Sequence, residues 1–95
     1  MAEEKIKRLA SLVESADDSM MYMLLVSLIS SDSIMCLEDC ESAMEVCRDL
    51  KEAIKIADIG EKKRTIYLGY IDKNIDIINQ DIKYYTNEKP KNNEQ

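Results

Sequence analysis

The ten residues from Met20 to Ile29 read MMYMLLVSLI and form the most apolar stretch of the chain. Around this block, the segment from Leu9 to Cys47 contains eight carboxylates and no lysine or arginine. A helix through the block would be apolar on every side. The chain's own core can bury only one side of it, so the other side is expected to be buried by another molecule. A negatively charged, apolar surface is unsuited to nucleic acid or to an anionic membrane and is suited to another protein.

The composition bounds both fold and chemistry. A chain of 95 residues makes one domain, near the size at which burying surface against a partner aids stability. It contains no His, Trp or Phe, only two Gly and one Pro, and its net charge is −6. The lack of histidine removes the commonest general base and a common metal ligand. The lack of turn residues predicts long helices.

Apolar residues spaced three and four apart predict one continuous helix over about residues 3–30. Asp17 to Ser19 fall outside its hydrophobic stripe, so a continuous helix needs fewer assumptions than two short ones. The residues expected to face the core of the bundle are Ile6, Leu9, Val13, Ala16, Met20 and Met23, with Leu12, Leu24 and Leu28 widening the stripe.

Two further helices follow. Serines 30, 31 and 33 predict a turn and a helix start, and Gly60 predicts a helix end, so the second helix is expected over about 33–58. Its stripe is Cys36, Cys40, Ala43, Cys47, Leu50, Ile54 and Ala57. The third helix is expected over about 61–86, and Gly69 costs it about 1 kcal/mol relative to Ala without ending it. Its stripe is Leu68, Ile71, Ile75, Ile78, Ile82 and Tyr85.

The predicted fold class is all-α. Three long helices with short connections favour an antiparallel up-down-up bundle over residues 1–86, and a coiled-coil assembly through the helix ends is the alternative. Residues 87–95 are polar, contain the only proline, and are predicted to form a disordered tail.

The three cysteines lie on one face of the second predicted helix. They suit either a thiolate metal site or core packing, but structural zinc needs four nitrogen or sulfur ligands, so we predict packing and no metal. Inward-facing carboxylates and glycine-rich phosphate loops are missing from the pattern, which predicts no cofactor and a protein that is not an enzyme. Enzyme or metal-carrier function would require the cysteines to bind something.

The chain has three cysteines, an odd number, and its charged N-terminal residues do not resemble a signal peptide. Both features predict a reducing, cytoplasmic location. Residues 20–37 reach the lower length limit of a membrane span, but their serines and the lack of flanking Lys or Arg argue against one. The basic run at residues 62–64 is too short for a nucleic-acid site. An acidic stripe along the second helix is read as either a solvated face or a dock for a basic protein, and it consists of Glu38, Glu41, Glu45, Asp49 and Glu52.

The residues left outside the expected core stripe of the first helix are the predicted protein-interaction site: Met21, Tyr22, Leu25, Val26 and Ile29. We expect this site to form a homo-oligomer, most simply a dimer, or to bind a protein with a hydrophobic patch and a basic rim. The predicted function is a small acidic interaction module, such as a regulator, inhibitor or adaptor. The alternative is a structural subunit of a homo-oligomeric, viral or filament assembly.

Overall fold

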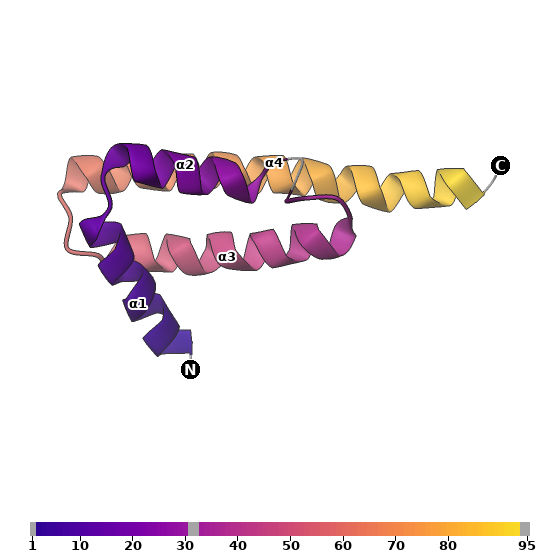
Figure 1. Cartoon of the computed structure of the whole chain (residues 1–95). Helices are drawn as coiled ribbons and strands as arrows, with labels where there is room; N and C mark the ends of the chain where they lie inside the picture. Colours follow the sequence, from indigo (N-terminus) through magenta and orange to yellow (C-terminus); the bar gives the residue numbers. More distant parts are fainter. Residues whose placement is uncertain (1, 31–32, 94–95) are drawn as a thin grey trace.

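The computed structural model describes residues 2–30 and 33–93, and this part of the chain consists of four helices and no strand (Figure 1). The helices are α1 (Ala2–Ser15), α2 (Asp18–Leu28), α3 (Leu37–Ile56) and α4 (Glu61–Asn93). The all-α prediction is confirmed. The number of helices differs from the three that were expected, because the first predicted helix is divided in two.

The division lies at Asp17. Its backbone is extended, with φ −91° and ψ 176°, and its carboxylate Oδ1 accepts a hydrogen bond of 2.8 Å from the backbone N–H of Met20. A short oxygen side chain in this position satisfies one of the free N–H groups at a helix start. The prediction of a continuous helix over 3–30 is therefore wrong. The break lets α1 turn away from α2 and pack against α3.

α4 contacts both α2 and α3, and α3 also contacts α1. The hydrogen bonds from Tyr67 to Asp18 and from Asn74 to Leu25 both join residues 49 positions apart, so α2 and α4 run in the same direction. α3 runs antiparallel to α4 and packs against it, while α1 packs obliquely on α3 (Figure 1). A three-helix up-down-up bundle is thus not confirmed.

The ends of the last two helices also differ from those expected. α3 begins at Leu37 rather than near residue 33, and residues 31 and 32 of the predicted helix start lie outside the described part. α4 extends to Asn93, seven residues beyond the expected end at 86. Residues 87–93 of the predicted tail are therefore helical, and residues 94 and 95 lie outside the described part. Disorder of this segment stays a prediction.

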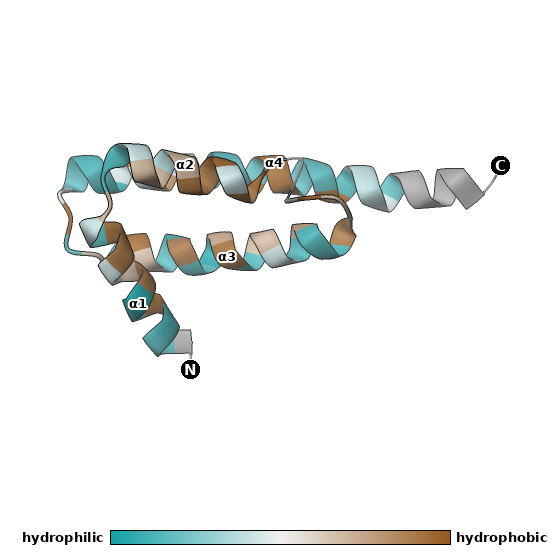
Figure 2. Cartoon of the chain, viewed as in Figure 1, coloured by the Kyte–Doolittle hydropathy of each residue, from teal (hydrophilic) through white to brown (hydrophobic). Residues whose placement is uncertain are grey.

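Two groups of buried apolar residues form the core. The larger one joins α1 and α2 to the C-terminal half of α3 and the N-terminal half of α4. The smaller one joins Ile34 and the N-terminal half of α3 to Ile78. The predicted stripe of α3 is buried apart from Cys36, which lies exposed at the start of the helix. Figure 2 shows that apolar residues are concentrated along α2.

The connection between α3 and α4 is held by two charged side chains. The Arg64 guanidinium donates hydrogen bonds of 3.0–3.3 Å to the backbone carbonyls of residues 54, 55, 57 and 59, which lie at and after the end of α3. The Glu14 carboxylate of α1 accepts a 2.7 Å bond from the N–H of Asp58. Among the described residues no helix combines the length and the apolarity that a membrane span requires.

Candidate protein interaction site

The structure differs from the prediction at two residues on each face of α2, whereas Leu24 and Leu28 pack against the core as expected. Met20 and Met23, expected in the core, are 60% and 70% exposed. Met21 and Leu25, predicted to form an interaction surface, are 0% and 2% exposed and belong to the larger core group. The prediction that Met21 and Leu25 lie outside the core is therefore wrong. The break at Asp17 is the reason, because α2 no longer continues the stripe of α1 and orients itself on α4 instead.

The other predicted site residues lie beside a groove between α2 and α4. Tyr22 and Val26 are 57% and 42% exposed, and Ile29 is half-buried. The groove has a volume of about 220 Å³ and is lined by Tyr22, Leu25, Val26, Ile29, Tyr70, Lys73, Asn74 and Ile77. Four of the five predicted residues are thus brought together, with Leu25 forming part of the floor. The α4 side of the groove was not predicted.

Three contacts fix α2 along α4 and so shape this groove. The Tyr67 hydroxyl donates a 2.9 Å hydrogen bond to Asp18 Oδ1 at one end. In the middle, the Tyr22 and Tyr70 rings meet edge to face with centroids 5.9 Å apart. Tyr67 is fully buried, and burial followed by the neighbouring Asp18 carboxylate raises its pKa to about 12. Tyr67 therefore stays a hydrogen-bond donor well above neutral pH.

Asn74 supplies the third contact. Its Nδ2 donates a 2.9 Å hydrogen bond to the backbone carbonyl of Leu25, and only 5% of the residue is exposed. At this end of α2 the N–H of Ile29, four residues after Leu25, bonds to the carbonyl of Val26. The carbonyl of Leu25 is therefore free to accept a hydrogen bond from a side chain of α4. Sequence reasoning missed Asn74. The available signal was its position three residues after Ile71 and four before Ile78, inside an apolar stripe.

Half of the carboxylates in the acidic stretch from Leu9 to Cys47 accept hydrogen bonds from other groups of the chain. Asp17 caps α2, Asp18 accepts from Tyr67, Glu14 accepts from the N–H of Asp58, and Asp39 accepts a 3.0 Å bond from the N–H of Met35. Asp32 lies outside the described residues. Glu38, Glu41 and Glu45 are exposed on α3. Part of the acidity that suggested an electrostatic surface therefore serves local structure.

Two of the three cysteines lie in the core. Cys40 and Cys47 are buried and pack in the smaller core group as predicted, whereas Cys36 is exposed. Burial is the main cause that raises the pKa of the Cys40 and Cys47 thiols, which keeps them protonated and poorly nucleophilic. Within the described residues no three His, Cys, Asp or Glu side chains are grouped to hold a metal ion.

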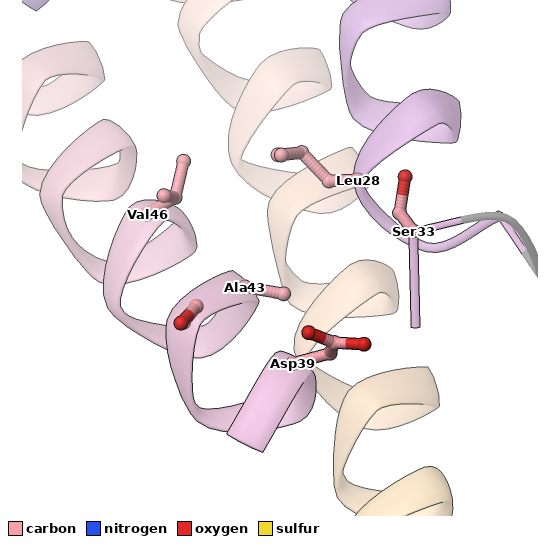
Figure 3. A pocket seen from close by; sticks show the side chains of 6 residues that line it. Leu28, Ser33, Asp39, Ala43 and Val46 are labelled. Carbon is pink, nitrogen blue, oxygen red and sulfur yellow. The ribbon is translucent and has the colours of Figure 1, made fainter. Parts of the chain in front are cut away.

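A second cavity of about 190 Å³ lies between the end of α2 and α3 (Figure 3). Its lining residues are Leu28, Ser33, Asp39, Ser42, Ala43 and Val46. The Ser33 hydroxyl donates a 2.7 Å bond to the carbonyl of Ser27, and Asp39 accepts from Met35. Two of the polar side chains that line this cavity therefore form hydrogen bonds within the α2–α3 connection.

The α2–α4 face is defined here as the exposed large apolar residues of α2, namely Met20, Tyr22, Met23 and Val26, together with Tyr70, Lys73 and Ile77 of α4. Its α2 half carries no charged side chain between Ser19 and Ser30. Comparison with protein-family models, with curated proteins and with solved structures gave no match for this chain.

Proposed function

We propose that this chain is a small helical protein–protein interaction module that acts as a regulator, inhibitor or adaptor through the α2–α4 face. The observation that carries the proposal is the exposure of large apolar side chains on α2, from 42% for Val26 to 70% for Met23, in a part of the helix that has no charged residue after Asp18. A helix surface that faces only water normally carries charged or polar residues. Contiguous exposed apolar residues mark interaction sites in soluble proteins.

The chemistry of the partner follows from this face and from the exposed acidic residues of α3. A hydrophobic patch on the partner would cover Met23 and Val26, and methionine adapts its shape to the surface it meets. A basic rim on the partner would meet the exposed carboxylates on α3, because four others are already bound within the chain. Burial of the apolar residues would supply most of the affinity, while the charges would orient the approach.

A structural subunit of a homo-oligomeric assembly is the second candidate. The same uncharged surface of α2 supports it, since permanent self-interfaces are more apolar than transient ones. Sedimentation or light scattering at increasing concentration separates the two candidates. A monomer or a small closed oligomer supports the module, and an open-ended distribution of masses supports the assembly subunit.

Two valines allow a matched test of the face. Val26 on α2 is 42% exposed and Val46 on α3 is 38% exposed, so Val26→Lys and Val46→Lys introduce the same charge at similarly accessible positions. The wild-type chain and both variants would be used to capture binding proteins from cells that express the chain, after circular dichroism has shown that all three are folded.

The proposal predicts that a protein bound by the wild type is retained by Val46→Lys and lost with Val26→Lys, because a lysine in the centre of an apolar interface is costly to bury. Retention by Val26→Lys, or equal loss with both variants, would remove α2 from the binding surface. Self-association that disappears only with Val26→Lys would assign the face to a homo-oligomer.

A further inference from the structure

The groove between α2 and α4 has one charged lining residue, Lys73. Lys73 is exposed, and the ion pairs found among the described residues do not include it. By contrast, Lys51 on the neighbouring helix α3 pairs with Asp72 of α4 at 3.0 Å. The groove is therefore an apolar depression with an unpaired cation at its edge.

The groove also limits the backbone structure of whatever fills it. The Asn74 amide in the lining already donates to the Leu25 carbonyl, and the remaining lining is mainly aliphatic and aromatic. An extended segment would bring unpaired backbone N–H and C=O groups against these side chains. A helix satisfies its own backbone hydrogen bonds and can place residues at i, i+3 or i+4, and i+7 into a groove of this kind.

We propose that this groove binds one amphipathic helix of another protein, and that this helix carries an Asp or Glu that pairs with Lys73. The inference rests on the proposed function and specifies the occupant of the same site. The apolar residues of the incoming helix pack between Tyr22, Val26 and Ile77. Its carboxylate meets the Lys73 ammonium, whose methylene groups can lie along the apolar wall.

Charge complementarity favours this occupant over a second copy of the chain. A two-fold dimer through the groove would place the same lining on both sides of the interface. That lining contains Lys73 and no carboxylate. The dimer would therefore bring together two unpaired cations, and like charges opposed across an interface disfavour binding.

Gly69 lies on α4 beside Lys73, at an exposed position next to the residues that line the groove. It lies in the interior of α4, one helical turn before Lys73, where glycine weakens a helix relative to alanine. A Cβ at this position would have no atom within 4 Å, so packing inside the chain does not require glycine here. An incoming helix that crosses α4 beside Lys73 would use the missing side chain to bring its backbone nearer.

The experiment selects helices directly on the folded chain. A displayed library of helical peptides of about 16 residues, randomised along one face, is selected for binding to the full chain, and the enriched peptides are synthesised. Their affinities are measured by fluorescence anisotropy for the wild type, Val26→Lys, Lys73→Glu and Gly69→Ala. Lys83→Glu is the matched control, because Lys83 is exposed on α4 and lies ten residues, or about 15 Å along the helix, beyond Lys73.

The enriched peptides should share an apolar stripe and an Asp or Glu, and should fail to bind Val26→Lys. Lys73→Glu should weaken their binding roughly tenfold, while Lys83→Glu leaves it unchanged. Gly69→Ala should raise the melting temperature of the free chain by about 4–8 °C and still weaken peptide binding.

Two results would overturn the inference in different ways. Peptides that need Val26 but carry no acid, or that bind Lys73→Glu as well as the wild type, would remove the Lys73 pairing and leave the proposed function standing. Absence of any peptide whose binding depends on Val26, or a dimer of the wild-type chain that Val26→Lys dissociates, would remove the helix-binding groove itself.

Discussion

Asn74 shows how one polar residue in the core can set the position of a helix. Its amide reaches from α4 to the carbonyl of Leu25 near the end of α2, over 2.9 Å. Shape alone would allow a leucine at this place in the stripe between Ile71 and Ile78. The amide adds a directional contact that is satisfied at one register of α2 against α4.

Replacing Asn74 with leucine should lower the free energy of unfolding by about 1–3 kcal/mol, because the Leu25 carbonyl loses its partner while it remains buried. Asn79→Leu on the exposed side of the same helix is the control, and a change within about 0.5 kcal/mol is expected there. Chemical denaturation of both variants measures the difference. Equal stabilities for the two variants would show that the amide contact contributes nothing.

Tyr67 makes the free energy of unfolding depend on pH in the alkaline range. Its pKa is raised by burial and by Asp18 from 10.0 to about 12, so the folded chain holds the phenol proton more tightly than the unfolded chain does. Below pH 10 both states are protonated and the contribution is fully present. As the pH rises from about 10 to about 12 the unfolded state loses its proton first, and the free energy of unfolding therefore falls.

Tyr67→Phe should reduce this alkaline loss of stability, as measured by urea denaturation at a series of pH values. Tyr22→Phe is the control, because Tyr22 is 57% exposed and is not the tyrosine that Asp18 binds, and it should retain the decline. An unchanged decline in Tyr67→Phe would assign the effect to other groups.

At the scale of elements, charged side chains bind the free backbone groups at the start of α2 and at the end of α3. Asp17 starts α2 by accepting from Met20, and Arg64 binds four carbonyls around the end of α3 while its Nε also bonds to Glu61. The last carbonyls of a helix have no partner within it, and a guanidinium fork can reach several at once. Arg64 thereby links the end of α3 to the start of α4.

Arg64→Lys should lower the free energy of unfolding by about 2 kcal/mol, since a single ammonium cannot reproduce the fork and leaves carbonyls unpaired. Arg48→Lys, at an exposed position of α3, provides the control and should change stability by less than about 0.5 kcal/mol. Thermal and chemical unfolding of the two variants make the comparison. A neutral Arg64→Lys would mean that water satisfies these carbonyls equally well.

At the scale of the whole molecule, the four helices do not share the core equally. α3 and α4 have the most extensive contact with each other, and α1 packs chiefly on α3. α1 contributes Val13, which is 0% exposed, but has only 14 residues, and helices of this length are marginal without tertiary contacts. The molecule is elongated, with extents of 53 × 28 × 19 Å, which leaves α1 at one side.

Hydrogen exchange should therefore show that α1 opens at a lower free energy than α3 and α4. Val13→Ala should lower the opening free energy of the α1 amides further, whereas Leu12→Ala, at a residue 47% exposed, should change it little. Exchange of α1 and α3 with the same free energy in the wild type would instead show that the four helices unfold together.

The sequence by itself determined the all-helical class and much of the interior. The scarcity of glycine and proline and the spacing of apolar residues predicted α3 and α4, including the burial of Cys40, Cys47, Leu50 and Ile71. These features could be read because helix periodicity is local: a residue and its neighbours three and four positions away share one face whatever packs against it.

Only the tertiary structure decided how α2 is oriented and what completes the candidate site. An almost wholly apolar helix has no polar face to mark its outside, so Met20 and Met23 could not be distinguished from Met21 and Leu25 by pattern. Contacts made from α4, 49 residues away, settled the choice by bonding Asp18 and the Leu25 carbonyl. Such long-range contacts leave no period in the sequence, which is why Lys73 and the α4 wall of the groove became visible only in the folded chain.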